Sequence, residues 1–409
     1  MLVFYNIGIR LYGLGVRVAS LFNPKAKKWL NGRIGLLEKI EQETASFSGE
    51  TLWVHCASLG EFEMARPIVE QLKAADSHLR IVLTFFSPSG YEVRKNYRSA
   101  DHVFYLPLDT PSNAKRFVKA IKPNKVIFVK YDLWFHHLNV AKDFGANLIL
   151  ISATFRPEQV YFKPYGSVGR DALLLFDRIF LVDEGSEMLI HSIGIKNTQV
   201  CGDTRYDRVM EIAATAEGNE IIEAFKGNSK LIICGSTWKE DEEVLRDSIS
   251  DLKDVKLAIA PHEVGEENIQ RIQKMFPDSI RYSQTDPERS RRVNSQVLII
   301  DSIGLLNKLY RYADVVYIGG GFRTGLHNIF EATAFGVPTL FGPDTSRFPD
   351  AAEMAQKGLA FRIQNRAELK AKLDELLSQD QAELRIEIKS FMTSRTGATK
   401  AILEYTNKC

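Results

Sequence analysis

One carboxylate early in the chain has the setting of a catalytic base. Glu61 follows the small-residue run 57–60, which follows the apolar run 51–56. This pattern predicts a strand, a tight turn and a helix whose first turn presents Glu61 to a ligand. In that position the carboxylate can remove a proton from an incoming hydroxyl. The alternative is a first-turn glutamate that only satisfies the helix dipole and the free N–H groups.

A second group of residues has the types and spacing of a nucleotide site. The stretch 317–343 begins as a buried strand, breaks into a glycine cluster that includes Gly320, and reads as a helix from about His327. Free backbone N–H groups beside a helix start can hold a phosphate. Asn328 and Glu331 are three residues apart, so they share a helix face and could accept the hydroxyls of a ribose. The alternative is that these glycines only form tight turns.

Three more strand ends in the same half carry residues that can face a nucleotide. Apolar runs of strand length occur at 230–234, 255–260 and 296–300. Because parallel strands end at one edge of their sheet, we expect the residues after them to line the same site. These residues are Gly235, Ser236 and Thr237 after the first run, Pro261 and His262 after the second, and Ser302, Ile303 and Gly304 after the third.

Both groups need a scaffold of strands alternating with helices. Apolar runs alternate with helical patterns from residue 51 to about 182, and again from residue 230. This alternation predicts two doubly wound Rossmann-type α/β domains with parallel sheets that face a central cleft. The expected division is a separate segment 1–33, an N-terminal domain 34–209, a linker 210–228, a C-terminal domain 229–390 and a final helix 391–409. The final helix overlaps a helical pattern over 382–405.

Residues 1–33 differ from the rest of the chain. Apolar residues surround one narrow polar stripe, and two arginines within it would each cost about 2.5–3.5 kcal/mol near the centre of a bilayer. An amphipathic helix in the membrane interface fits better, with the basic residues that follow touching anionic headgroups. A helix packed on this protein's own domain and a short single-pass anchor are the alternatives. The stripe is Asn6, Arg10, Gly13, Arg17 and Ser20, and the basic residues are Lys25, Lys27, Lys28 and Arg33, with Trp29 among them.

The composition bounds the class of protein. The 409 residues carry a formal net charge of +2, which argues against a dedicated nucleic-acid-binding protein. A hydrophobic content of 45% and a charged content of 25% are ordinary for a globular protein. The four cysteines form no C-x-x-C pair, which indicates reduced thiols in the cytoplasm and no metal-site spacing.

With these residues in view, the chain resembles the 3-deoxy-D-manno-octulosonic acid (Kdo) transferases, inverting glycosyltransferases of the two-domain GT-B fold. The resemblance implies a CMP-Kdo donor, a lipid A precursor as acceptor, and attachment to the cytoplasmic face of the inner membrane. It also implies that Glu61 is the general base and that no metal or other cofactor is needed. The segments that carry it are 57–63, 152–156, 202–207, 235–238, 260–263 and 327–331.

The mechanism that the resemblance implies assigns roles to further residues. The departing phosphate needs its charge stabilised, for which Arg205, Arg323 and the backbone amides at 235–237 and 319–321 are candidates. Arg156 and Lys130 are candidates for the carboxylate of Kdo or the phosphates of the acceptor. Arg205 could instead pair with Asp203 or Asp207. Ser58 and Gly60 are expected on the acceptor side.

Two rival functions fit parts of the pattern. A nucleotide-sugar epimerase would share the two-domain scaffold, but it would not need the amphipathic, basic N-terminus. A non-catalytic, membrane-associated nucleotide-sugar-binding protein would bind the donor without transferring it. The sequence does not determine the number of Kdo residues transferred, the acyl pattern of the acceptor or the oligomeric state.

Overall fold

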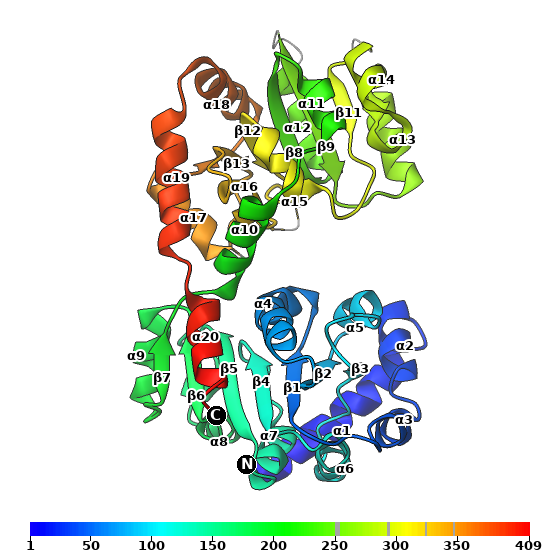
Figure 1. Ribbon diagram of the computed structural model, residues 1–409, viewed down its shortest axis with the longest axis vertical. Coiled ribbons are helices and arrows are strands. Elements are labelled where there is room, and N and C mark those ends of the chain that lie inside the picture. Colours follow the sequence, from blue (N-terminus) through cyan, green and yellow to red (C-terminus); the bar gives the residue numbers. More distant parts are fainter. Residues whose placement is uncertain (250–253, 293–294, 324, 347) are drawn as a thin grey trace. The chain divides into compact units, whose positions relative to one another are not determined.

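Two parallel sheets of seven strands each organise the chain in the computed structural model (Figure 1). The structure describes residues 1–249, 254–292, 295–323, 325–346 and 348–409. The chain divides into a first unit of residues 1–207 and 396–409 and a second unit of residues 208–395. The helix α10 (Thr204–Thr215) contains the first of these two boundaries. The two units are described separately.

The sheet of the first unit has the order β3-β2-β1-β4-β5-β6-β7, and all neighbouring strands are parallel. Alternate residues of the central strand face opposite sides: Trp53 joins one core cluster, whereas Leu52 and Val54 join the other. Burial on both faces explains the continuous apolar runs in the sequence. The strands are β1 (Thr51–Cys56), β2 (Arg80–Phe85), β3 (His102–Tyr105), β4 (Lys125–Val129), β5 (Asn147–Ala153), β6 (Arg178–Leu181) and β7 (Thr198–Val200).

Helices cover both faces of this sheet. Phe117 of α6 packs in the cluster with Trp53, while Ile68 of α4 and Ile402 of α20 pack in the other cluster. The C-terminal helix α20 therefore belongs to the first unit, although the second unit precedes it in the sequence (Figure 1). The helices that follow the strands are α4 (Leu59–Ala75), α5 (Pro88–Arg94), α6 (Pro111–Ile121), α7 (Phe135–Asp143), α8 (Ser167–Leu174) and α9 (Glu184–Ser192), with α20 at Ala398–Thr406.

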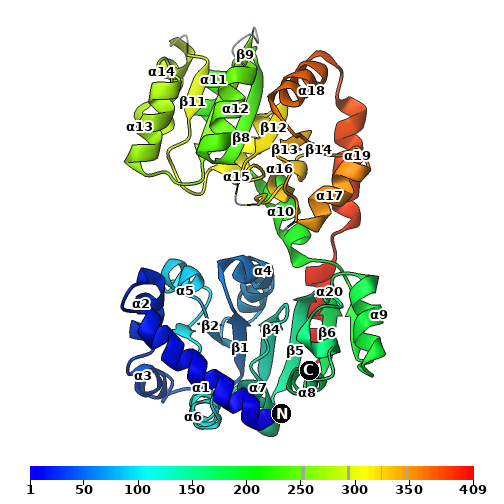
Figure 2. The ribbon, with the colours of Figure 1, turned by 180° about the vertical axis from the view of Figure 1, so that it is seen from behind.

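Three N-terminal helices complete the first unit: α1 (Leu2–Ala19), α2 (Pro24–Asn31) and α3 (Leu36–Glu43). Figure 2 shows α1 in the foreground, along the outside of this unit. Part of its polar side faces the protein: the Tyr5 hydroxyl donates to Asp109 Oδ2 (2.6 Å), and Asn6 Oδ1 lies 2.6 Å from His136 Nε2. Asp109 and His136 follow β3 and β4, so α1 crosses the carboxyl ends of these strands.

The apolar side of α1 faces outward. Phe4 is 72% exposed, and Phe22 just after the helix is 86% exposed. A helix on a globular protein normally turns its apolar side inward, so this arrangement leaves a large apolar surface uncovered within the first unit. The helix therefore packs on its own domain through a mixed side, with Tyr5 and Asn6 hydrogen-bonded and Ile9 buried, and keeps an apolar side free. The exposed apolar residues are Leu2, Val3, Phe4, Ile7, Leu11, Leu14, Val18, Leu21 and Phe22.

The sheet of the second unit has the order β10-β11-β9-β8-β12-β13-β14 and is also parallel throughout. Ile232 of β8, Leu245 of α12 and Leu373 of α18 share one core cluster. The strands are β8 (Lys230–Thr237), β9 (Val255–Pro261), β10 (Ile280–Arg281), β11 (Val297–Ile299), β12 (Val315–Ile318), β13 (Thr339–Phe341) and β14 (Phe361–Arg362).

The first helix named below precedes the sheet of the second unit, and the others follow its strands or form its carboxyl-terminal part. They are α11 (Glu220–Lys226), α12 (Lys239–Ile249), α13 (Glu266–Met275), α14 (Pro287–Arg292), α15 (Leu306–Leu309), α16 (Phe330–Thr333), α17 (Pro349–Gln356), α18 (Arg366–Ser378) and α19 (Ala382–Ser394).

Several expected helices have different bounds in the structure. The helix expected from about His327 is the single turn α16, which begins only at Phe330. The helical pattern over 382–405 is broken between α19 and α20, because Gly397 adopts a positive φ of 118° that stops a continuous helix. The expected linker 210–228 consists largely of helix, and the units divide after 207 and after 395.

Candidate functional site

Glu61 lies in the first turn of α4, directly after the carboxyl end of the central strand β1. Its Oε2 accepts a hydrogen bond from the backbone N–H of Ala57, which holds the carboxylate over the turn. The side chain remains partly accessible. This contact is one structural reason for a glutamate at position 61, because a carboxylate in the first turn of a helix satisfies a free N–H group. The carboxylate is thus held at the strand end while the residue keeps part of its surface open.

The pKa of Glu61 is raised to about 7, first by burial and then by the negative charge of Asp132. Hydrogen bonds from the backbone of Ala57 and Ser58 and the charge of Lys130 act in the opposite direction. A carboxyl group with a pKa near neutrality can exchange a proton at the pH of the cell. The environment of Glu61 is therefore suited to general-base catalysis.

Asp132 and His55 are functional candidates that the sequence did not reveal. Asp132 Oδ2 lies 2.9 Å from Nε2 of the buried His55 and accepts a hydrogen bond from Trp134 Nε1 (2.9 Å). The other nitrogen of His55 lies 2.9 Å from the Thr84 hydroxyl. These bonds fix the carboxylate whose charge raises the pKa of Glu61. His55 sits inside an apolar run and Asp132 in an irregular loop, so no spacing in the sequence connected them.

The basic residues predicted for the first unit lie around the strand ends next to β1. Lys130 directly follows β4 and has a positive φ of 62°. Its pKa is lowered, mainly by burial and next by the charge of Arg205. Asp203, Glu61 and Arg156 also act on the pKa of Lys130, so these charges lie within range of one another. The structure thus brings Lys130, Arg205 and Arg156 together near Glu61, at the carboxyl ends of the strands.

Arg205 pairs with Asp203, one of the two carboxylates that the sequence analysis offered as partners. Its Nε and Nη2 donate to Asp203 Oδ2 at 3.0 and 2.7 Å. Asp207 has a different role: its carboxylate accepts from the N–H groups of Gly397 (2.6 Å) and Thr399 (2.7 Å) at the start of α20. Arg205 therefore carries a charge that Asp203 already compensates in large part.

Ser58 and Gly60 border Glu61 in the turn before and at the start of α4. An added Cβ at Gly60 would meet only the Ser58 hydroxyl, at 4.0 Å. Packing therefore does not require glycine at position 60, and the space above it is open. Ser58 and Gly60 therefore border Glu61 without covering it, and they stay candidates for acceptor contacts.

In the second unit, the loops after β8 and β12 lie against each other. The Gly319 N–H donates to Gly235 O (2.9 Å), and an added Cβ at Gly319 would lie 2.7 Å from Thr237 Cα. Ser236 forms a bulge in β8 with a positive φ of 52°. The His262 N–H after β9 donates to Thr237 O (2.9 Å), which adds a third strand end to the group.

The expectation of free amides in the glycine cluster is wrong for Gly319 and Gly320. Asp241 Oδ2 accepts from the N–H of Gly320 (2.9 Å) and of Trp238 (2.9 Å), and its Oδ1 accepts from the Tyr317 hydroxyl (2.7 Å). The first turn of α12 thus supplies an internal carboxylate where a phosphate was expected. A role of Gly320 in donor binding cannot rest on its N–H group.

Three aromatic rings stack beside this loop. The rings of Trp238 and His262 are 4.7 Å apart, and those of His262 and His327 are 4.5 Å apart. Trp238 Nε1 donates to His327 Nε2 (3.0 Å), and burial together with His262 lowers the pKa of His327 to about 4. His327 is therefore neutral near pH 7. The guanidinium of Arg323 lies 5.3 Å from the Trp238 ring, near Glu240.

Asn328 and Glu331 keep their expected proximity without the expected helix. Asn328 Oδ1 caps the N–H of Phe330 (3.1 Å), and Asn328 Nδ2 donates to Glu331 Oε1 (3.4 Å). Glu331 raises the pKa of the buried Tyr310 after the larger effect of burial, and Tyr310 packs against Gly235. The pair thus belongs to the same group of loops as Gly235.

The remaining predicted residues lie at neighbouring strand ends. Pro261 ends β9, and Ser302, Ile303 and Gly304 follow β11, the strand next to β9. Ile303 is almost fully exposed. Within the described part of the chain, no cluster of three or more His, Cys, Asp or Glu side chains could hold a metal ion.

Comparisons with known proteins connect this architecture to one family. A family model described as 3-deoxy-D-manno-octulosonic-acid transferase (kdotransferase) matches residues 28–208. A 3-deoxy-D-manno-octulosonic acid transferase of Aquifex aeolicus is 30% identical over 347 residues, which cover 83% of this chain and 89% of that protein. A protein of the same name from Rickettsia felis is 25% identical over 361 residues, which cover 85% of this chain and 75% of that protein.

A solved structure shows the same fold. The UDP-GlcNAc 2-epimerase of Neisseria meningitidis has a TM-score of 0.61 and 16% sequence identity to this chain, and the match covers 88% of this chain and 100% of that one. At this identity the likeness shows the fold alone. The fold is GT-B-like, with two parallel α/β sheets.

Proposed function

Because the chain belongs to the 3-deoxy-D-manno-octulosonic acid (Kdo) transferase family of glycosyltransferases, we propose that it transfers Kdo from CMP-Kdo to a lipid A precursor. This reaction is a step in building the core of lipopolysaccharide. The observation that carries the proposal is Glu61, which lies at the carboxyl end of the central strand with a pKa raised to about 7.

In the proposed mechanism, Glu61 takes the proton of an acceptor hydroxyl. The hydroxyl oxygen forms a bond to the anomeric carbon of Kdo as the bond from that carbon to the phosphate oxygen of CMP breaks. One displacement inverts the anomeric centre. CMP leaves with a charge that the protein must stabilise, because a phosphate needs no protonation to depart.

Basic residues supply the positive charge that this chemistry needs. Lys130 and Arg156 belong to the group around Glu61 and are proposed to contact the carboxylate of Kdo or the phosphates of the acceptor. Arg205 is held by Asp203, which supports a positioning role. Arg323, exposed on the ring of Trp238, is the candidate in the second unit for the phosphate of CMP.

The second unit is proposed to hold the nucleotide. Support comes from the grouping of Gly235–Thr237, Pro261, His262, Gly320, Asn328 and Glu331 at adjoining strand ends. Ser302, Ile303 and Gly304 extend this edge by one strand. The stacked rings of His262 and His327 offer an aromatic surface for a base, and Asn328 and Glu331 offer polar atoms for a ribose.

The exposed apolar side of α1 supports attachment to the cytoplasmic face of the inner membrane. No helix among the described residues is both long and apolar enough to cross a bilayer. A monotopic association through α1 would place the acceptor's own membrane next to the strand ends that α1 crosses. The proposal of a lipid acceptor and that of membrane attachment thus support each other.

The first test is the replacement Glu61→Gln, assayed with CMP-Kdo and a detergent-dispersed lipid A precursor. Glutamine can keep the hydrogen bond from Ala57 but cannot accept a proton, so we expect kcat to fall by about 10²–10⁴ with little change in donor affinity. The matched control is Glu63→Gln, because Glu63 lies on the same helix as Glu61 and pairs with Arg66 of that helix and with Arg94 of α5. Near-normal turnover of the Glu61 variant would remove the base role.

A nucleotide-sugar epimerase remains distinguishable by its product. An epimerase would convert the nucleotide sugar without any acceptor, whereas the proposed enzyme releases CMP only when an acceptor is present. The likeness to the Neisseria meningitidis epimerase is one of fold and does not favour epimerisation.

A further inference from the structure

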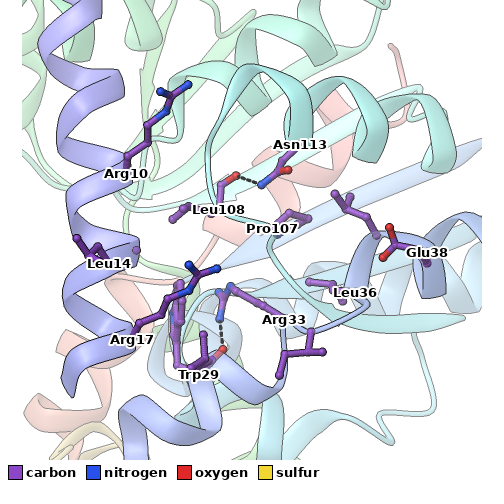
Figure 3. A pocket seen from close by; sticks show the side chains of 14 residues that line it. Arg10, Leu14, Arg17, Trp29, Arg33, Leu36, Glu38, Pro107, Leu108 and Asn113 are labelled. Atoms are coloured by element: carbon purple, nitrogen blue, oxygen red, sulfur yellow. Dashed lines mark hydrogen bonds between the residues drawn. The ribbon is translucent and has the colours of Figure 1, made fainter. Parts of the chain in front are cut away.

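A pocket of about 520 Å³ lies between α1, α2 and the segment that follows β3 (Figure 3). Three arginines line it: Arg10 and Arg17 from α1, and Arg33 after α2. Arg10 and Arg17 are seven residues apart, so they share one side of the helix. Figure 3 shows both side chains extending from α1 toward the pocket. None of these arginines belongs to the group around Glu61.

Arg33 forms a fixed wall of this pocket. Its guanidinium donates to the carbonyl oxygens of Leu106 (2.9 Å), Phe86 (2.9 Å) and Trp29 (3.1 Å), and it lies 3.8 Å from the centre of the Trp29 ring. Burial lowers its pKa to about 9, so it stays charged at neutral pH. The expectation that Arg33 touches headgroups at the surface is corrected, because each of its three side-chain nitrogens donates to a backbone carbonyl of the protein.

Arg10 and Arg17 are exposed, and their side chains make no hydrogen bond or ion pair with any described residue. The carboxylate that lines the pocket, Glu38, is bonded to Arg116 (2.9 Å). The pocket thus concentrates positive charge that no carboxylate compensates among the described residues. Guanidinium groups bind phosphate through two parallel hydrogen bonds, so paired arginines suit this ligand.

The apolar side of α1 continues this pocket. Leu14 lines the pocket and is also exposed, and Leu11 and Val18 lie one turn away on the uncovered face. An occupant that fits both parts has an anionic head and an apolar tail. A free anion would leave the apolar face uncovered, and an uncharged lipid would leave the arginines unpaired.

We propose that this pocket binds the phosphate headgroup of an anionic membrane lipid, with the acyl chains along the outer face of α1. The site would fix the orientation of α1 at the bilayer surface, beyond a general attraction of basic residues to negative charge. This inference rests on the proposed membrane attachment of α1. The inference adds that Arg10 and Arg17 hold the lipid phosphate in this attachment.

The test compares the binding of two charge-matched double variants of the full chain to vesicles. Arg10→Gln with Arg17→Gln removes two charges from the pocket, whereas Lys25→Gln with Lys28→Gln removes two charges from α2 outside it. Vesicles of phosphatidylcholine alone, with phosphatidic acid, or with phosphatidylglycerol at equal charge are sedimented with each protein. Soluble glycerol 3-phosphate serves as the competitor without acyl chains.

We expect the pocket variant to bind phosphatidic acid vesicles about tenfold more weakly than the control variant, since a bound phosphate loses its direct partners. Equal losses in the two variants would reduce the pocket to general surface charge and overturn the proposal. Full displacement by glycerol 3-phosphate would show a free-phosphate site instead. If the double variant does not fold, the single variants Arg10→Gln and Arg17→Gln give the same comparison.

Lipid binding is measured without CMP-Kdo, and Kdo transfer is assayed separately on a detergent-dispersed acceptor. Absence of transfer by the unaltered protein would count against the proposed function. Unselective lipid binding by an active enzyme would count only against the pocket.

Discussion

At the scale of residues, the pair Glu61 and Asp132 decides how the proposed reaction depends on pH. Burial and then Asp132 raise the pKa of Glu61 to about 7, so Glu61 is protonated and inactive as a base at lower pH. Activity should therefore rise as the pH increases through about 7. Glu61→Gln should lose this rise, because its side chain does not titrate in this range.

The replacement Asp132→Asn tests the origin of this pKa. It removes one negative charge near Glu61, so the pKa of Glu61 should fall and the acidic limb of kcat/KM should move to lower pH by about one unit at most. Glu63→Gln is the control, because Glu63 is not among the main causes of the raised pKa of Glu61. An unchanged pH profile in the Asp132 variant would mean that burial alone sets the pKa.

At the scale of elements, α1 is an amphipathic helix that contacts its own domain through Tyr5, Asn6 and Ile9 and leaves an apolar side exposed. Deleting it would also remove Tyr5, the hydrogen-bond partner of Asp109, so deletion would mix membrane binding with stability. Substitutions on the outer face separate these effects. Replacing Phe4, Leu11 and Val18 by serine should weaken vesicle binding about tenfold or more, because each loses apolar surface that the bilayer would cover.

The free energy of unfolding of the same triple variant should stay within about 0.5 kcal/mol per residue of that of the original protein, because the three replaced side chains are exposed. Ile9→Ser is the contrasting control: Ile9 is buried against the domain, and its replacement should cost about 2–4 kcal/mol of the free energy of unfolding. Chemical denaturation measures both values. Strong vesicle binding by the triple variant would contradict a role of the outer face.

At the scale of the whole molecule, the chain leaves the first unit through α10 and returns to it after Arg395. Asp207 holds the start of the returning helix α20, because its carboxylate accepts hydrogen bonds from the N–H groups of Gly397 and Thr399. Asp207→Ala should lower the free energy of unfolding by about 1–3 kcal/mol, because two backbone donors lose their charged acceptor. The exposed Asp171→Ala is the control, and equal stability of the two variants would show that α20 holds without this contact.

The sequence by itself determined most strands and the class of fold. The run 51–56 is a strand with the expected bounds, and the run 255–260 is a strand that ends one residue later, because burial on both faces of a parallel sheet leaves an uninterrupted apolar pattern. It missed β7, β10 and β14, which have only two or three residues each and too little pattern to detect. It placed the start of α16 too early, since Asn328 caps the turn from outside instead of lying within it.

Only the tertiary structure decided which groups surround each candidate residue. Glu61 could be singled out from its position after a strand, but its partners Asp132 and Ala57 come from separate turns. Asp241 lies far from Gly320 in the sequence, yet it occupies the amide expected for a phosphate. The apolar pattern of α1 predicted an amphipathic helix, whereas packing decided that Tyr5, Asn6 and Ile9 face the protein and that a broad apolar side does not. Local periodicity specifies elements, but hydrogen bonds, pKa values and exposed surfaces depend on contacts between residues that are distant in the chain.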